Sequence, residues 1–262
     1  MASRNILDYA KDNFKRFEES PFNSVDSLIL CQLFYSRIET QVKKNNVKVW
    51  TVKDLYKAEY FDKMFSDGIS DEENRKLLTI LASSPRFRDI RIKNIISETS
   101  KKRVMQFAAV TYELSDEIDY VCFRGTDGTM IGWKEDFNMV FMEETPSQAN
   151  AARYLKVFYE ENYSKKIYIG GHSKGGNLAV YSACLVGEEI QSKIIQIFSH
   201  DGPGFRDEMY DSYGYLSIAD KINKTIPQTS VVGMLLAPQE DFKVIRSDAR
   251  GFAQHSAFTW LV

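Results

Sequence analysis

The chain passes from a short apolar run into a helical pattern at residues 167–176, Ile-Tyr-Ile-Gly-Gly-His-Ser-Lys-Gly-Gly. A serine stands between the two patterns in the arrangement Gly171-X-Ser173-X-Gly175. A strand that turns sharply into a helix at such a serine is a nucleophile elbow, in which the side-chain oxygen projects above the sheet. The turn is so tight that a Cβ atom at either glycine would collide with the neighbouring strand or helix. The stretch therefore predicts that Ser173 is a nucleophile.

The helix expected after Ser173 is small or apolar on nearly all sides, from Asn177 to Leu185. This composition is typical of a helix buried beneath the centre of a sheet. Its N-terminus points at the serine, so the amide of Lys174 is placed to stabilise an oxyanion with the help of the helix dipole. We expect the side chains of Lys174 and His172 to point elsewhere, because the roles at both positions belong to the backbone.

A serine hydroxyl needs a base to take its proton, and the chain has three histidines. His172 lies in the elbow and is too constrained to turn back on Ser173. His200 follows an apolar run, where a structural or substrate-lining role is the better interpretation. His255 remains, in a loop after the strand expected at 242–247. A loop after the last strand is where an α/β-hydrolase keeps its base.

Four carboxylates are candidates for the acid that orients this base. Asp201 follows the first strand expected after the nucleophile helix, and the Gly-Pro-Gly turn behind it would hold the carboxylate at the sheet edge. Glu240 and Asp241 follow the next expected strand, in a segment that reads as an exposed hairpin with solvated charges. Asp248 lies in the same loop as His255. We prefer Asp201 and leave the other three open.

A second oxyanion donor should come from an earlier strand end. The β-rich run 118–123 ends in Arg124-Gly125-Thr126-Asp127, with Trp133 and Asp136 shortly beyond. Taken with Gly171-His172-Ser173-Lys174-Gly175-Gly176-Asn177, the pattern resembles the class 3, or fungal-type, triacylglycerol lipase family. The resemblance covers residues 104–205 well and later residues loosely. It implies a lipase-like fold and an oxyanion hole in which Thr126 supplies a backbone amide and a hydroxyl.

The whole-chain pattern also resembles a bacterial family related to those lipases. The segments that carry this second resemblance are Asn5-Ile6-Leu7-Asp8-Tyr9, Pro21-Phe22-Asn23, Asp201-Gly202-Pro203-Gly204-Phe205 and Gln254-His255. In one respect the chain departs from the lipases, which place their acid around the strand after Asp201. The corresponding segments, Thr225-Ile226-Pro227 and Ser230-Val231-Val232-Gly233, contain no carboxylate. Either Asp201 supplies the acid, as in the pancreatic-type lipases, or the triad is incomplete.

Composition points to an enzyme of the cytoplasm. The chain has 262 residues, 44% of them hydrophobic, and a formal net charge of −2, which argues against nucleic acid as the main partner. No apolar run is long enough for a transmembrane helix, and residues 1–20 are too charged for a signal peptide. Cys31, Cys122 and Cys184 are widely spaced in apolar segments, as expected of reduced core cysteines.

We predict an α/β-hydrolase fold with a mostly parallel central sheet, in a single domain of residues 1–262. Residues 1–100 read as mainly helical, and no linker-like stretch separates them from the core of residues 101–262, so we expect a helical cap or flank packed on it. The strands are expected near 104–113, 118–124, 166–171, 194–199, 229–236 and 242–247. The helices are expected near 147–163 and 175–187, with shorter ones near 206–222.

The motifs favour three functions from different classes. The first is a serine hydrolase that cleaves a carboxylic ester, of a small molecule or a lipid, through an acyl-enzyme on Ser173, without cofactor or metal. The second is an acyltransferase with the same triad and an alcohol as acceptor. The third is a binding protein that has kept the fold and lost a working acid. Labelling by a fluorophosphonate probe separates the third from the others, because only an activated serine reacts.

Overall fold

The computed structural model describes residues 4–42, 50–66, 68, 70–127, 129–236 and 241–262. In these residues eight strands form one sheet, in which spatial order follows chain order. Strands β1 to β4 pair antiparallel, and β4 to β8 pair parallel. The strands are β1 (Trp50–Thr51), β2 (Arg91–Ser100), β3 (Met105–Glu113), β4 (Ile118–Phe123), β5 (Lys166–His172), β6 (Ile194–His200), β7 (Ile222–Pro227) and β8 (Phe242–Ile245).

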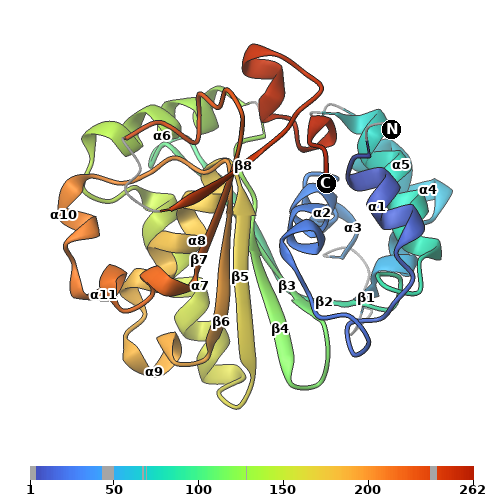
Figure 1. Cartoon of the computed structure of the whole chain (residues 1–262), viewed down its shortest axis with the longest axis horizontal. Coiled ribbons are helices and arrows are strands. Elements are labelled where there is room, and N and C mark those ends of the chain that lie inside the picture. The colour runs from blue at the N-terminus through green and yellow to red at the C-terminus, as the bar shows by residue number, and fades with distance from the viewer. Residues whose placement is uncertain (1–3, 43–49, 67, 69, 128, 237–240) are drawn as a thin grey trace.

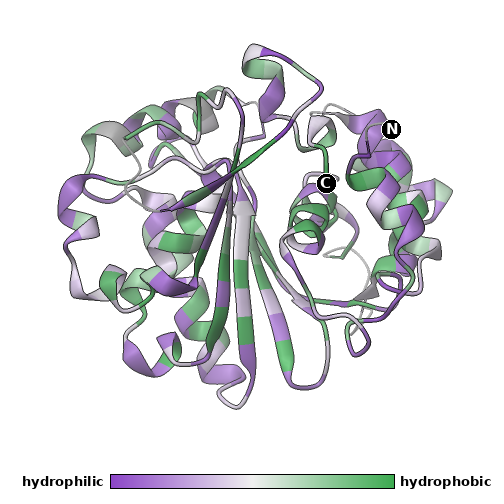
Figure 2. Cartoon of the chain, viewed as in Figure 1, coloured by the Kyte–Doolittle hydropathy of each residue, from purple (hydrophilic) through white to green (hydrophobic). Residues whose placement is uncertain are grey.

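Helices cover both faces of this sheet (Figure 1). On one face lie α7 (Pro146–Glu161) and α8 (Lys174–Leu185), and on the other lie α1 (Ile6–Asp12), α2 (Ser24–Phe34) and α5 (Asp71–Ser83). Side chains alternate along a strand, so β4 serves both layers. Tyr120 and Cys122 join the core cluster on the side of α2, whereas Val121 and Phe123 join the cluster on the side of α8. Figure 2 shows the corresponding hydrophobic residues in the strands and on the helices.

Asparagine caps fix the start of two N-terminal helices. The side chains of Asn5 and Asn23 accept hydrogen bonds from the first turns of α1 and α2, and Asp8 and Asp26 accept in return from the cap amides. These capping boxes satisfy backbone groups that a helix start leaves unpaired. The other helices are α3 (Glu39–Val42), α4 (Ala58–Met64), α6 (Met130–Phe141), α9 (Glu188–Gln191), α10 (Asp207–Tyr210), α11 (Tyr213–Leu216), η1 (Val52–Leu55), η2 (Ala219–Lys221), η3 (Gly251–His255) and η4 (Ala257–Thr259).

The α/β-hydrolase fold predicted from the sequence is confirmed, with one strand placed wrongly. The strand expected near 229–236 is instead a series of turns, and the position in the sheet is taken by β7. The apolar side chains of that segment misled the prediction, because Val232 and Leu235 line a pocket rather than the sheet. The sequence patterns also gave no indication of β2 and α6.

Candidate active site

The chain makes the predicted sharp turn between β5 and α8, with Ser173 at its apex. Ser173 has φ 59° and ψ −133°, a backbone conformation that is costly for a residue with a side chain. A Cβ on Gly171 would overlap the backbone of Gly175, and a Cβ on Gly175 would overlap the carbonyl of Phe123. The Ser173 amide donates to the carbonyl oxygen of His200 at 2.9 Å, which ties the turn to the neighbouring strand β6.

The structure brings Asp201 and His255 together across the end of the sheet. The imidazole Nδ1 lies 2.6 Å from Asp201 Oδ2. The other carboxylate oxygen, Oδ1, accepts a hydrogen bond from the Ser230 hydroxyl and one from the Gly233 amide at 3.1 Å. A carboxylate with these partners is fixed on both oxygens. Ser230 and Gly233 belong to the segment that lacks a carboxylate of its own, and they serve as donors to Asp201 instead.

The other candidate acids lie elsewhere. Asp241 and Asp248 are exposed, and Glu240 lies outside the described residues. His200 is buried on the α2 side of the sheet, where Nε2 contacts the Ser27 hydroxyl at 3.0 Å and Nδ1 contacts the Thr225 hydroxyl at 2.8 Å. Burial lowers the pKa of His200 to about 3, so the ring is neutral and structural.

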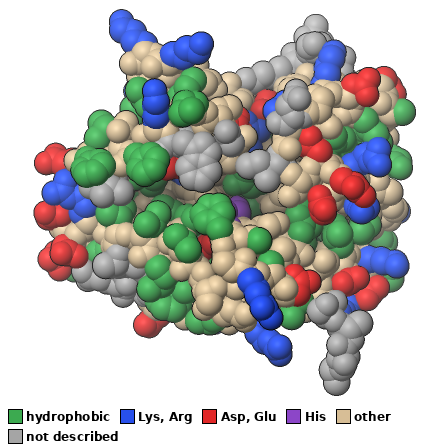
Figure 3. Space-filling model, turned by 90° about the horizontal axis from the view of Figure 1, so that it is seen from above, with side chains coloured by type: hydrophobic (Ala, Val, Ile, Leu, Met, Phe, Trp, Pro, Cys, Tyr) green, Lys and Arg blue, Asp and Glu red, His purple; other side chains and the backbone are tan. Residues whose placement is uncertain are grey.

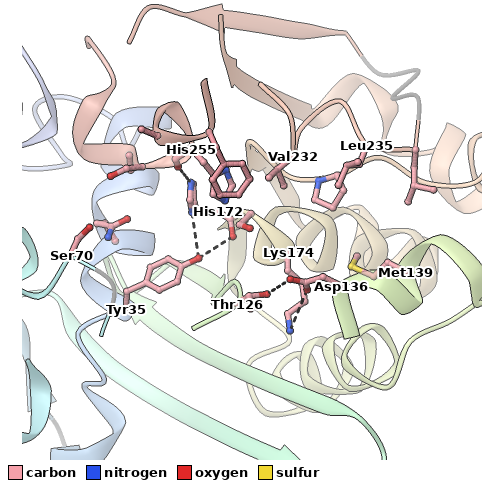
Figure 4. A pocket seen from close by; sticks show the side chains of 18 residues that line it. Tyr35, Ser70, Thr126, Asp136, Met139, His172, Lys174, Val232, Leu235 and His255 are labelled. Atoms are coloured by element: carbon pink, nitrogen blue, oxygen red, sulfur yellow. Dashed lines mark hydrogen bonds and ion pairs between the residues drawn. The ribbon is translucent and has the colours of Figure 1, made fainter. Parts of the chain in front are cut away.

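Thr126 lies three residues after the end of β4 and lines the same pocket as Ser173 and His255. Its hydroxyl donates to Asp136 Oδ2 at 2.6 Å, which ties the loop to α6 (Figure 4). Burial raises the pKa of Asp136, while the Lys174 ammonium and the Thr126 hydroxyl act in the opposite direction. A hydroxyl has one proton to donate. While the hydroxyl donates to Asp136, Thr126 can offer an oxyanion bound beside Ser173 a hydrogen bond only from its backbone amide.

The side chain of Lys174 runs away from Ser173 into a buried ion pair. Its Nζ lies 3.0 Å from Glu135 Oε2 and 2.9 Å from the carbonyl oxygen of Gln106, and both charged side chains are almost fully buried. Glu135 also accepts from the amides of Gln106 and Ser147. The pair therefore joins α8, α6, β3 and α7 beneath the Thr126 loop. The Lys174 side chain points away from Ser173, as expected from the sequence, but no sequence pattern indicated Glu135 as its partner.

Ser173, His255 and Thr126 line one pocket of about 280 Å³. Seen from above in Figure 3, a histidine is visible in a hollow bordered by hydrophobic side chains. The pocket walls are mostly apolar and include Met139, Val232, Leu235, Leu236 and Phe252. His172 lines it as well, contrary to the expectation that its side chain would point elsewhere. Gln32 and Tyr35 of the N-terminal segment complete the wall.

Two features are absent from the described part of the chain: a cluster of metal-ligating side chains and a helix that could span a membrane. There, no group of three or more histidine, cysteine, aspartate or glutamate side chains is placed to hold a metal ion. None of the helices described is both long and apolar enough to cross a bilayer.

Solved structures of lipases share this arrangement of helices and strands. A fungal lipase–inhibitor complex matches with a TM-score of 0.53 at 14% identity, over 85% of this chain and 78% of the other. The Rhizomucor miehei lipase propeptide complex matches with a TM-score of 0.50 at 15% identity, over 84% of this chain and 66% of the other. At such low identity these matches establish the shared fold: this is an α/β-hydrolase fold of the fungal lipase type.

A family assignment follows from the sequence itself. The family profile described as Mbeg1-like matches residues 81–262, which is more than half of the chain. The protein therefore belongs to the Mbeg1-like family. No curated protein sequence matches it.

Proposed function

We propose that the protein is a serine hydrolase that cleaves a carboxylic ester with an apolar acyl group, such as a lipid or acylglycerol ester. The observation that carries this proposal is the 2.6 Å contact between Asp201 and His255, beside a serine in a nucleophile elbow that lines the same pocket. A carboxylate, an imidazole and a serine in this relation are the parts of a catalytic triad on any fold.

In the proposed reaction Ser173 Oγ attacks the ester carbonyl carbon while His255 Nε2 takes the hydroxyl proton. The oxyanion that forms is held by the amides of Lys174 and Thr126, with the α8 dipole in support. The carbon–oxygen bond to the alcohol then breaks, and the alcohol leaves with the proton from His255. Water attacks the acyl-enzyme with the same base, releases the acid and returns the proton to Ser173. Asp201 holds the imidazole with Nδ1 protonated throughout.

An apolar acyl group is the substrate class that the pocket fits. Met139, Val232 and Leu236 offer no charge to a substrate, and Leu235 and Phe252 are exposed where they border the pocket. Exposed apolar side chains next to a concave apolar site are typical of ligand binding. The similar solved structures are described as lipases, which supports a substrate of this class. An acyltransferase would use the same residues, since exclusion of water depends on the pocket.

A cytoplasmic location is part of the proposal. Cys31 and Cys122 are buried thiols whose sulfur atoms lie 3.7 Å apart without a disulfide between them, as expected in a reducing compartment.

Hydrolysis of p-nitrophenyl esters with acyl chains of increasing length tests the proposal. We expect turnover by the wild-type protein, and Ser173→Ala should lower it by at least about three orders of magnitude. Ser192→Ala, at an exposed serine that ends α9, is the matched control and should keep the wild-type rate. No turnover on any ester, or equal turnover by Ser173→Ala, would contradict the proposal. Product analysis with added alcohol separates hydrolysis from acyl transfer.

A further inference from the structure

His172, the residue before the nucleophile, lies directly against His255. The two rings are 4.6 Å apart between centroids and inclined by 33°, so one partly stacks on the other. His172 is buried, with 6% of its surface exposed. Its Nε2 lies 2.8 Å from the backbone carbonyl oxygen of His255 (Figure 4). Asp201 thus contacts the His255 ring, and His172 contacts the His255 main chain.

The partners of His172 determine its tautomer. A carbonyl oxygen can only accept, so Nε2 must carry the hydrogen and Nδ1 of the neutral ring must be an acceptor. The hydroxyl of Tyr35 lies 3.4 Å from Nδ1 and 3.5 Å from the His172 carbonyl oxygen, where it can donate. Burial, together with the nearby His255 and His200, holds the pKa of His172 well below its usual value. The ring is therefore a neutral link between Tyr35 and His255.

Tyr35 reaches this place from the N-terminal helical segment. It forms the C-cap of α2 and lies outside residues 81–262, which the family profile matches. Its hydroxyl packs so closely on the Thr126 loop that a Cβ on Gly125 would overlap it. Burial raises the pKa of Tyr35, so the hydroxyl keeps its proton as a donor. One side chain thus contacts both the loop of the proposed oxyanion hole and the histidine beside the nucleophile.

His255 needs a main-chain anchor because of its place in the chain. It ends the short helix η3, in which Gly251, Phe252 and Ala253 are exposed. The contact with Asp201 restrains one ring atom, and the neighbouring Gln254 holds η3 through its carbonyl oxygen, which accepts from Trp260 Nε1 at 2.7 Å. The bond from His172 adds an anchor at the main chain of His255 itself. A displacement of about 1 Å in a reacting group can cost a hundredfold in rate.

We infer that His172 is a positioning residue for His255, held by Tyr35, and that the N-terminal segment thereby takes part in assembling the site. This inference rests on the proposed function, since it concerns the base of that reaction. A neutral His172 also avoids repulsion of the imidazolium that His255 becomes when it takes the serine proton. A charged residue in this stacked position would oppose that step.

Three substitutions test the inference in the full-length protein. Tyr35→Phe removes only the hydroxyl, and the loss of one hydrogen bond should lower kcat up to about tenfold with KM retained. His172→Phe keeps a ring and removes the bond to His255, so kcat should fall by about a hundredfold. His172→Gln keeps an N–H that can donate to the carbonyl and should recover part of that loss. Tyr154→Phe is the control, because its hydroxyl contacts Thr111 at 2.8 Å and no residue of the site.

Nitrogen-15 NMR reports the tautomer of His172 directly in the wild-type protein. His172 should be the Nε2–H tautomer and stay neutral at pH values where an exposed histidine is protonated, because burial holds its pKa well below the usual value. The Nδ1 proton of His255 should give a downfield resonance from its bond to Asp201, and His172→Phe should broaden or remove it. A His172 that carries its hydrogen on Nδ1 would overturn the inference, even if His172→Phe fails to fold.

Failure of this inference and failure of the proposed function give different results in these experiments. If the wild-type protein turns over esters while Tyr35→Phe and His172→Phe match Tyr154→Phe in kcat, the inference is wrong and the proposed function stands. If the wild-type protein turns over no ester, the proposed function fails. In that case the inferred positioning of a base fails with it, and the tautomer of His172 still reports whether the hydrogen-bonded link exists.

Discussion

The two sides of Ser173 are assembled from different kinds of interaction. On the side of the proposed base, Asp201, Ser230 and His255 come from three distant segments and are joined by hydrogen bonds. On the side of the proposed oxyanion hole, Lys174 and Glu135 form a buried ion pair beneath the loop that carries the oxyanion donor. His255 keeps 21% of its side chain exposed, whereas Lys174 keeps 2%.

Because of this difference, substitutions on the two sides should affect different properties of the protein. On the base side His255 is partly exposed, so water replaces some of what a lost hydrogen bond there removes. Asp201 is buried, but an asparagine of the same size keeps an oxygen that can accept from Ser230 and Gly233. A buried ion pair cannot lose one member without leaving an unpaired charge in the interior. Changes on the base side should therefore act mainly on rate, and changes at Lys174 mainly on stability.

The largest effect on rate among changes to the partners of Ser173 is expected from Asp201→Asn. An asparagine donates to Nδ1 and so favours the wrong tautomer of His255, which should lower kcat about ten-thousandfold while the fold is retained. Asp248→Asn, at an exposed carboxylate of the same C-terminal loop, is the control and should leave the rate unchanged. A rate for Asp201→Asn within a few-fold of wild type would remove Asp201 from the triad.

Lys174→Met should lower the free energy of unfolding by about 3–5 kcal/mol, because Glu135 is left charged and unpaired in the interior. Urea denaturation measures the change. The double variant Lys174→Met/Glu135→Gln should regain much of the loss, since Glu135 is then neutral and only the more exposed Asp136, 3.9 Å from Nζ in the wild-type protein, still lacks the cation. If the single variant is as stable as the wild-type protein, the ion pair does not support this side of the site.

If the Thr126 hydroxyl turns from Asp136 to the oxyanion during the reaction, Thr126→Val should lower kcat about a hundredfold with little change in KM, the usual loss for one oxyanion donor. Valine keeps the amide and removes both the bond to Asp136 and the hydroxyl that could turn to the oxyanion. Thr126→Ser restores the hydroxyl and should recover the rate. An unchanged kcat in Thr126→Val would limit the contribution of Thr126 to its backbone.

The smallest expected effect is a pH dependence of stability from His200, whose carbonyl holds the Ser173 amide. Its pKa is about 3 in the folded protein against 6.5 ordinarily, so between these values only the unfolded chain binds the proton. The contribution of neutral His200 to the free energy of unfolding is therefore fully present above pH 6.5. It falls as the pH falls, by about 2 kcal/mol at pH 5, because the unfolded chain takes up a proton that the folded protein does not. His200→Gln should flatten the dependence between pH 7 and pH 5, measured by urea denaturation. An equal slope in both proteins would contradict the prediction.

Local sequence determined what could be foreseen of this fold and site. The elbow at Ser173 is contiguous, and with only three histidines His255 could be selected by elimination. The contact of Asp201 with His255 was expected from a rigid turn at a strand end, and it is present. The roles of these residues in catalysis stay proposals.

The features that were missed depend on partners distant in sequence. The apolar segment 229–236 reads as a strand, because nothing local shows that Ser230 and Gly233 bind Asp201. Glu135 lies 39 residues before Lys174, and nothing in the segments around these two residues indicates that they pair. The contact of His172 with His255 likewise spans 83 residues.

The central claim, that Ser173 is an activated nucleophile, is tested most directly by mass-spectrometric mapping after reaction with a fluorophosphonate probe. The account predicts a single adduct on the peptide that contains Ser173. The adduct should be absent from Ser173→Ala and form far more slowly in Asp201→Asn. A folded wild-type protein that gains no adduct, or that gains one on another residue and keeps it in Ser173→Ala, would contradict the account.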